Sequence, residues 1–345
     1  MSSLGGYYIV RSEDFVYNPR ISTSAPVGPI NRNKLGRIGV MSPLYTVFRP
    51  HDIDTTYLEY FFKSKYWHSF MNFNGDSGAR SDRFSIKDSV FFEMPIPIPH
   101  IDEQKKIGAF LDKLDSLITL HQRKYDKLTK VKKAMLEKMF PENGSPYPEI
   151  RFKGFTDAWE QHKLGEFADI VGGGTPSTSN FEYWDGDIDW YAPAEIADQI
   201  FVSSSERKIT QQGYDNSSAK MLPVGTVLFT SRAGIGKTAI LRKEGCTNQG
   251  FQSIVPHINE LDSYFIFSRS EEMKRYGETV GAGSTFVEVS GKQMANMELM
   301  MPTTMEEQVT IGSFFRNLDS IITLHQRKLE KLKNIKKACL EKMFV

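Results

Sequence analysis

Residues 114–124 read LDSLITLHQRK, and residues 318–328 read LDSIITLHQRK, 204 positions later. Extended without a gap, the match joins 103–140 to 307–344, and 25 of the 38 paired residues are identical. The segments that precede the two copies share only a faint pattern. Two nearly identical segments thus follow two divergent ones, which predicts that the chain performs one task twice and two different tasks once each.

Each copy predicts a long helix. Apolar residues recur every seven positions, with a second series four residues further on, a stripe typical of a coiled coil. His121 and Lys132 interrupt the stripe in the first copy, and His325 and Lys336 do so in the second. Polar residues at a seam can fix its register, and 38 residues would form a rod of about 57 Å. We expect antiparallel pairing through Leu114, Ile118, Leu128, Leu318, Ile322 and Leu332.

Charge is unevenly distributed along the 345 residues. The net charge is only +1, yet 121–138 and 325–342 each carry a net +5, which leaves −9 for the remainder. Basic charge concentrated on two helices can face nucleic acid or an acidic partner surface. A solvated lysine face on a long helix is the alternative interpretation.

Composition narrows the class of protein. The chain is 40% apolar and 25% charged, as in ordinary soluble proteins. No apolar run approaches the roughly 18 residues of a membrane span, and the N-terminus lacks a signal-peptide pattern. Cys246 and Cys339 form neither a metal-ligand set nor a disulfide framework. We therefore expect a cytoplasmic protein without membrane contact, metal or cofactor.

The fold class expected is α+β, with two globular mixed α/β domains separated by two long helices in an antiparallel coiled coil. PENGSPYP (141–148) ends the first helix as a stiff linker. Thr304 and Glu307 have capping-box spacing at the second helix. The expected segments are 1–98, the first domain; 99–140, the central helix; 141–155, the linker; 156–302, the second domain; and 303–345, the C-terminal helix.

The first domain matches only the later part of the second. DFVYNPR (14–20) parallels TVLFTSR (226–232), and 41–50 parallels 248–256. A counterpart to about 159–211 is missing. We expect the first domain to be incomplete at its N-terminus and less stable, or completed by another chain.

Several motifs, read together, resemble the DNA-specificity (S) subunit of type I restriction-modification systems. They are FTDAWEQHKLGE (155–166), GGGTPST (172–178), YWDGDIDWYAP (183–193), SRAGIGKT (231–238) and the doubled helix. The resemblance covers the whole chain. It implies two target-recognition domains, each reading half of a bipartite double-stranded DNA target, held apart by the helix pair. The helices would serve as a ruler and as a platform for methyltransferase (M) subunits.

The resemblance also assigns the chemistry to partners. Methylation at adenine N6, S-adenosylmethionine binding and ATP-driven cleavage would belong to two M subunits and to restriction (R) subunits. This chain departs from the family pattern in one respect, since nothing before Ser12 resembles 155–193. A second copy of the chain or a separate fragment could complete the first domain.

The SRAGIGKT segment is the strongest candidate for DNA contact. Arg232 can bond guanine bidentately, while Lys237 and the hydroxyls of Ser231 and Thr238 suit phosphates. A glycine turn with solvated charges is the alternative. In the GGGTPST loop, Thr175 and Ser177 could approach a phosphate closely, because glycine removes side-chain clashes. Further candidates are Lys163, Arg207, Lys208, Ser284 and Arg80, whereas Trp184, Trp190 and Tyr191 are expected in the core.

Two other functions compete with DNA reading. GIGKT suggests a P-loop NTPase with coiled-coil arms, but Ser231 stands where the first glycine of G-x-x-x-x-G-K-[ST] is required. The second competing function is that of a partial subunit with a structural or recombination-donor role. No catalytic set and no adenine-methylase signature stands out, which agrees with a non-catalytic DNA-recognition subunit.

Overall fold

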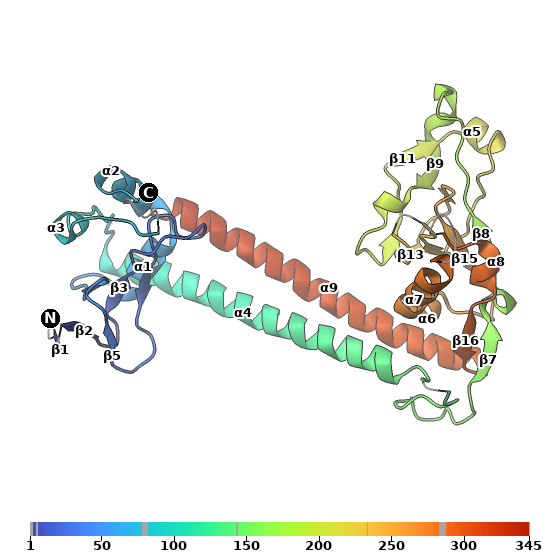
Figure 1. The fold of residues 1–345 in the computed structure, drawn as a ribbon, viewed down its shortest axis with the longest axis horizontal. Helices are drawn as coiled ribbons and strands as arrows, with labels where there is room; N and C mark the ends of the chain where they lie inside the picture. The colour runs from blue at the N-terminus through green and yellow to red at the C-terminus, as the bar shows by residue number, and fades with distance from the viewer. Residues whose placement is uncertain are drawn as a thin grey trace. The chain divides into compact units, whose positions relative to one another are not determined.

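The computed structural model describes residues 3–4 (backbone only), 6–77, 82–142, 144–232, 234–282 and 288–344. The chain forms two compact units: the first is Met1–Asp126 with Leu324–Val345, and the second is Lys127–Thr323. Two long helices, α4 (Ile101–Lys138) and α9 (Met305–Lys342), contribute one end to each unit (Figure 1). Both fall where the doubled heptad stripe predicts helix.

In the first unit, α4 and α9 pair through two polar contacts. The Lys336 ammonium donates to the Asp115 carboxylate. Nδ1 of His121 and Nδ1 of His325 lie 2.8 Å apart, so one ring donates to the other. Burial and the neighbouring His121 lower the pKa of His325, which keeps that ring neutral at pH 7. Residue numbers rise on α4 as they fall on α9, so the helix ends in this unit are antiparallel.

The second unit repeats this pairing. Lys132 Nζ lies 2.6 Å from Asp319 Oδ1, and the rings of Phe140 and Phe315 stack with centroids 6.0 Å apart. Asp319 and Lys132 lie 204 positions from Asp115 and Lys336, so the two ion pairs occupy equivalent places in the repeat. The antiparallel pairing predicted from the repeat is therefore confirmed in both units. Leu114 and Leu318 are buried, and Ile118, Leu128, Ile322 and Leu332 are partly buried.

In the first unit, the globular part docks on α4 through a helix cap. Asp54 caps α1 (Thr55–Lys63) by accepting the backbone N–H of Tyr57 at 2.8 Å. The N–H of Asp54 donates to Gln104 Oε1 on α4 at 2.9 Å. A Cβ at Gly108 would lie 3.2 Å from Asp54 Oδ1. A small residue is therefore favoured where the cap meets α4.

The second unit uses the same arrangement on α9. Asp262 caps α6 (Ser263–Ser268) by accepting from Phe265 N at 2.7 Å, and its N–H donates to Gln308 Oε1 at 3.1 Å. A Cβ at Gly312 would lie only 2.3 Å from Asp262 Oδ1. Gln308 and Gly312 are the counterparts of Gln104 and Gly108 in the repeat, 204 positions later. The identity of the two helices thus preserves one docking site for two different domains.

The start of α9 corrects one sequence prediction. Thr304 Oγ1 accepts the N–H of Glu307 at 3.3 Å, as a capping box requires. The Glu307 carboxylate, however, binds Arg151 and not the backbone of Thr304. The capping-box prediction is wrong for Glu307, because a buried arginine is the stronger partner for its carboxylate.

Small antiparallel sheets and short helices make up the rest of the first unit. One sheet has the order β1-β2-β5 and the other β4-β3-β6. Its core gathers Phe15 from β3, Tyr57 from α1, Leu111 from α4 and Phe344 from just after α9. The elements are β1 (Ser3–Leu4), β2 (Tyr7–Val10), β3 (Phe15–Tyr17), β4 (Ile30–Arg32), β5 (Gly39–Met41), β6 (Thr46–Phe48), α2 (Tyr66–Asn74) and α3 (Asp88–Phe91).

The second unit contains a five-stranded sheet, β10-β13-β12-β15-β8, and its helix α6 packs on α9 at Gly312 (Figure 1). A three-stranded sheet, β11-β9-β14, and the pair β16-β7 complete it. The elements are β7 (Glu160–Lys163), β8 (Ala168–Gly172), β9 (Trp184–Tyr191), β10 (Phe201–Val202), β11 (Arg207–Ile209), α5 (Gln211–Asp215), β12 (Val227–Phe229), β13 (Thr238–Leu241), β14 (Cys246–Thr247), β15 (Gln252–Pro256), α7 (Ser270–Gly281), α8 (Gly291–Ala295) and β16 (Glu298–Met301).

The sheets of the two units correspond in part, as the sequence parallels predict. In the first, β3 lies between β4 and β6; in the second, β12 lies between β13 and β15. The second sheet continues outward with β10 and β8. Within the described residues, no strand pairs with the outer edge of β4 or β6. The first unit thus has the central strands of the second without the flanking ones.

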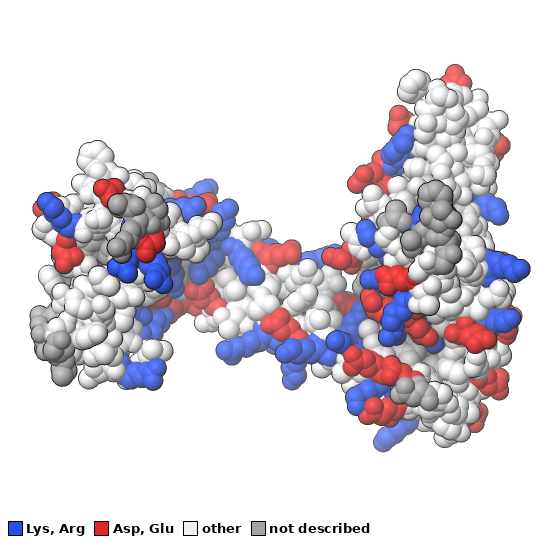
Figure 2. Space-filling view, viewed as in Figure 1, with Lys and Arg blue, Asp and Glu red and all other residues white. Residues whose placement is uncertain are grey.

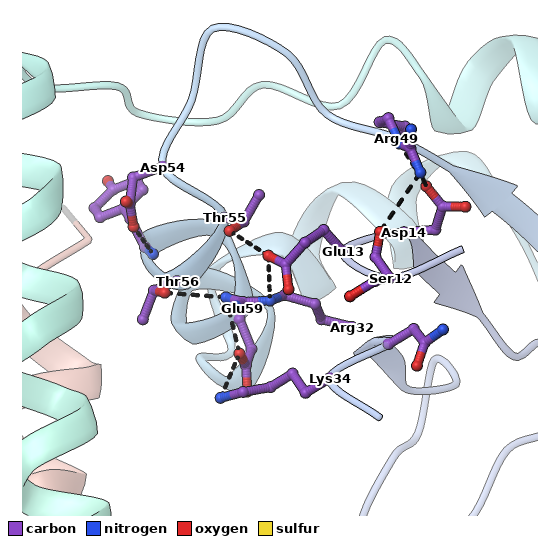
Figure 3. Close-up of polar contacts among 12 residues, drawn as sticks. Ser12, Glu13, Asp14, Arg32, Lys34, Arg49, Asp54, Thr55, Thr56 and Glu59 are labelled. Carbon is purple, nitrogen blue, oxygen red and sulfur yellow. Dashed lines mark hydrogen bonds and ion pairs between the residues drawn. The ribbon is translucent and has the colours of Figure 1, made fainter. Parts of the chain in front are cut away.

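Ion pairs tie β4 to α1 in the first unit (Figure 3). Arg32 Nη1 lies 3.0 Å from Thr56 Oγ1 and 3.3 Å from Glu59 Oε2. Lys34 and Lys63 hold the same carboxylate at 3.2 and 2.7 Å. Burial alone would raise the pKa of Glu59, but hydrogen bonds and charge from Lys63 and Lys34 hold it below its ordinary value.

The first unit is expected to lose stability in acid. The pKa of Glu59 is lowered by folding, so its contribution is present above the unfolded pKa of about 4.3 and disappears as pH falls through the folded value. Hydrogen exchange of 55–74, followed by mass spectrometry between pH 7 and 3, should show accelerating opening after correction for intrinsic rates. Glu59→Gln should open more easily at pH 7 and respond less to acid. An unchanged pH response in that variant would contradict the prediction.

Candidate nucleic-acid interface

The turn between β12 and β13 carries the SRAGIGKT residues. Thr230 closes it: its hydroxyl donates to the Gly234 carbonyl at 2.7 Å and accepts the N–H of Lys237 at 2.9 Å. The backbone of Thr230 and Lys237 pairs as well, at 3.0 Å. The ends of the turn are therefore well ordered by hydrogen bonds, and its side chains project from a stable base.

Ser231 and Arg232 occupy different environments. The Ser231 side chain is fully buried, and its backbone bonds Gly250 and Val289, at 2.8 and 3.0 Å. Its hydroxyl is therefore not accessible to a DNA phosphate in this conformation. Arg232 is 39% exposed and lies 3.7 Å from Glu288, a distance typical of a loose ion pair that a stronger acceptor could displace.

Lys237 and Thr238 line a hollow of about 460 Å³ in the second unit. Lys237 is exposed, while the Thr238 hydroxyl donates to Ser270 Oγ at 2.8 Å. Lys132 and Lys274 also line this hollow, together with the acids Asp198 and Glu271. Lys132 is already paired with Asp319, so Lys237 and Lys274 are the cations that could face a phosphate backbone there.

The geometry of this turn disfavours a nucleotide-binding P-loop. A P-loop joins a strand to a helix whose N-terminus faces the phosphates. Here β12 and β13 are antiparallel neighbours, with Val227 opposite Ile240 and Phe229 opposite Thr238. Thr238 begins strand β13, so the loop does not lead into a helix as a P-loop does.

The glycine-rich loop after β8 packs closely on residues 247 and 248. A Cβ at Gly173 would lie 2.0 Å from the Asn248 carbonyl oxygen, so only glycine fits. The hydroxyl of Thr175 donates to Gln249, and Ser177 is exposed with its hydroxyl 2.8 Å from Ser179. The close packing comes from the protein's own backbone, while the two hydroxyls remain near the surface.

Two buried tryptophans donate hydrogen bonds to the backbone of the glycine-rich loop. Trp190 Nε1 donates to the Gly174 carbonyl at 2.8 Å, and Trp184 Nε1 donates to the Ser177 carbonyl at 3.1 Å. Both indoles are buried, as is Tyr191, which confirms the prediction that these aromatics are core residues. Arg207 stacks its guanidinium on the Trp184 ring, 3.7 Å from the centroid. The stacking leaves the edge of the guanidinium free to donate to a ligand.

Lys208 is less available than Arg207. Its ammonium lies 3.4 Å from Asp189 Oδ1, and Lys243 lies 3.0 Å from Asp189 Oδ2. Burial would raise the pKa of Asp189, but the Ser205 N–H and the two lysines hold it below its usual range. The two lysines share one buried carboxylate, so the cluster keeps a net positive charge.

Residues 247–250 join the two predicted loops. Gly174 N donates to the Thr247 carbonyl at 2.9 Å, and Ser231 N donates to that of Gly250 at 2.8 Å. Gln249, exposed between them, was missed by the sequence analysis. An amide side chain can read adenine bidentately. The signal available in the sequence was the polar run TNQG (247–250) before a strand.

Other predicted contact residues lie apart or cannot be placed. Lys163 is exposed at the end of β7, opposite Glu298 of β16. Arg80 and Ser284 lie outside the described residues. On the face shown in Figure 2, basic and acidic side chains are mixed both along the long helices and over the globular parts. The structure thus joins Arg232, Thr175 and Ser177 through 247–250 and leaves Lys163 on another edge.

The sequence profile of the type I restriction modification DNA specificity domain matches residues 8–130 and 156–334. The chain belongs to this family. The two matched ranges each include a globular part and most of one long helix. The family membership predicted from the motifs is confirmed.

Relatives in the family agree. The chain is 34% identical over 190 residues to the type I restriction enzyme MjaIX specificity subunit of Methanocaldococcus jannaschii, covering 54% of this chain and 44% of the relative. It is 27% identical over 271 residues to the EcoR124I/EcoR124II specificity subunit of Escherichia coli, covering 75% and 65%. The matches thus span less than two thirds of the length of these curated relatives.

Solved structures share the fold. The S subunit from M. genitalium matches with a TM-score of 0.63 at 13% identity, covering 97% of this chain and 84% of that one. The HsdS subunit from Thermoanaerobacter tengcongensis matches with a TM-score of 0.53 at 19% identity, covering 97% and 81%. The mixed α/β domains with two long helices are therefore this family's fold.

Helical membrane spans and metal-binding clusters are both absent from the described residues. None of the helices there has both the length and the apolar character needed to cross a membrane. Nor do three or more His, Cys, Asp or Glu side chains gather there in a way that could hold a metal ion.

Proposed function

We propose that this chain is a cytoplasmic, non-catalytic subunit that reads double-stranded DNA for a type I restriction-modification complex. The family match over both globular parts is the observation that carries the proposal. Each globular part would read one half of a bipartite target. Two M subunits would bind the chain and methylate adenine N6, and R subunits would join through the complex.

The surface around 247–250 is proposed as the DNA contact of the second domain (156–302). Arg232 would read a base, because its guanidinium is exposed and only loosely paired. Gln249 joins it as a second reader of base edges. Ser231 keeps a supporting role through its backbone. Phosphate contacts are assigned to Lys237, Thr238, Thr175, Ser177, Arg207 and Lys208. Lys163, on another edge, and Ser284 and Arg80 (of the first domain, 1–98), outside the described residues, are proposed as further phosphate contacts.

Base-resolution mapping of methylated adenines tests the function. Cells would carry the chain with its M subunits, and control cells would carry the M subunits alone. The proposal expects methylation confined to one sequence that depends on the chain. Methylation without sequence preference, or at the same sites in the control, would contradict it.

Arg232 and Lys237 are expected to behave differently when replaced by alanine. Losing a base reader should weaken binding by about 1–3 kcal/mol and relax specificity at one position. Losing a phosphate contact should weaken binding to all sequences and reduce the salt slope by about one unit. Fluorescence anisotropy with duplexes at several salt concentrations measures both. Lys153→Ala, an exposed lysine in the linker, is the control, and unchanged binding in both test variants would contradict the assignment.

A partial subunit with a structural or recombination-donor role is the second candidate. The unpaired outer edges of β4 and β6, within the described residues, favour it. Such a chain would bind M subunits and yet show no specific duplex binding. Pull-down of M subunits alongside duplex titration therefore separates the two candidates.

A further inference from the structure

Equivalent glutamates on the long helices have opposite environments. Glu307 on α9 is 1% exposed and accepts two hydrogen bonds from Arg151, at 2.7 and 2.8 Å. Trp159 Nε1 lies 3.3 Å from the same carboxylate. Glu103 occupies the corresponding position on α4, 204 residues earlier, and is exposed. Within the described part of the chain, its carboxylate has no ion pair or hydrogen bond.

The apolar neighbours of these glutamates differ in the same way. Phe314 contacts Phe152, with ring centroids 5.8 Å apart. Its counterpart Phe110 is 44% exposed. Ile98, just before α4, is 58% exposed. A carboxylate flanked by exposed apolar side chains has the composition of a protein-binding surface more than that of a solvated helix face.

In the described structure, the segment before Glu103 also lacks the strand pairing of its counterpart, although Met94 N and the Pro97 carbonyl have other partners. In the second unit, β16 pairs with β7, which follows directly after Trp159. Residues 94–97 correspond to β16, and in the described structure they form no strand. The covered and uncovered forms of one surface are therefore both visible, on two helices that keep the glutamate and the phenylalanine at equivalent positions.

We propose that the face formed by Glu103, Phe110 and Ile98 binds a segment that contains an arginine followed directly by a phenylalanine. A tryptophan lies seven residues after that phenylalanine. Residues 149–166 show this chemistry at the equivalent face, where the arginine meets the glutamate and the phenylalanine meets the helix phenylalanine. The segment comes from outside residues 1–345, because the Arg151 and Trp159 of this chain, and those of a second copy, are committed to Glu307. The inference does not depend on DNA reading.

A synthetic peptide with the sequence of 149–166 tests this site on the full chain. Titration by calorimetry should show one binding site on the wild-type chain. Glu103→Gln should weaken binding at least about tenfold, because the peptide arginine loses its charged partner. Phe110→Ala should also weaken it. Asp126→Asn, an exposed acid on the same helix, is the matched control and should bind as the wild type does.

Peptide variants make the test specific. Replacing the peptide's arginine by glutamine should reduce binding to the wild-type chain and have little further effect on Glu103→Gln, since both changes remove the same ion pair. Replacing its tryptophan by alanine should weaken binding at least about thirtyfold if it is a central anchor. No binding to the wild-type chain, or equal binding to Glu103→Gln, would overturn the proposal.

Discussion

Glu307→Ala is expected to destabilise the second unit by about 3–5 kcal/mol, because it leaves the buried guanidinium of Arg151 without its partner. The side chain of Arg151 is 13% exposed and that of Glu307 1% exposed, so water cannot replace the lost carboxylate at little cost. Trp159 Nε1 loses the same acceptor. Urea unfolding followed by tryptophan fluorescence measures the effect, since three of the four tryptophans lie in the second unit.

The repeat supplies a matched control for this substitution. Glu103→Ala removes the same side chain from the equivalent position of α4, where it is exposed. We expect its effect to stay within about 0.5 kcal/mol, as for most surface substitutions. Equal losses in the two variants would show that the loss comes from helix propensity and not from the buried ion pair.

Leu318→Asp is expected to cost about 4 kcal/mol or more in the second unit, and Leu114→Asp a comparable amount in the first. Truncating a buried leucine to alanine already costs about 2–5 kcal/mol, and aspartate adds a carboxylate that has no partner there. The two leucines are 8% and 6% exposed. Thermal unfolding followed by circular dichroism at a helix wavelength should show a large fall in Tm for each variant.

Leu120 and Leu324 are the controls for this pair. They lie on the same helices, related by the same offset, but are 46% and 49% exposed. Leu120→Asp and Leu324→Asp should change stability by about 0.5 kcal/mol or less. If they were as damaging as the buried positions, the helix pairing would not be the source of the effect.

The periodic features of the fold could be predicted from the sequence. Heptad spacing located both helices. Two copies of one helix present equivalent surfaces, and these can meet symmetrically when the helices are antiparallel. The contact between the equivalent residues His121 and His325 shows this arrangement. The parallel between 14–20 and 226–232 located β3 and β12, which occupy equivalent places in their sheets. Such features depend on many residues at once, so a single exception does not hide them.

Single polar side chains were less predictable. Glu307 has capping-box spacing, yet it pairs with an arginine 156 positions away. Ser231 belongs to a polar loop, yet its side chain is buried beneath it. Gln249 carries no motif, and only the fold places it between the glycine-rich loop and the β12–β13 turn. Partners and burial of individual groups are set by tertiary packing, which local spacing does not encode.

The two cross-helix ion pairs also constrain how the family can change length. Asp115 and Lys132 are 17 residues apart on α4, and Asp319 and Lys336 are 17 residues apart on α9. An insertion between the first two alone would misalign at least one ion pair, whereas the same insertion in both helices would keep both. Viable descendants with longer or shorter helices should therefore carry paired insertions or deletions, inherited as a matched set.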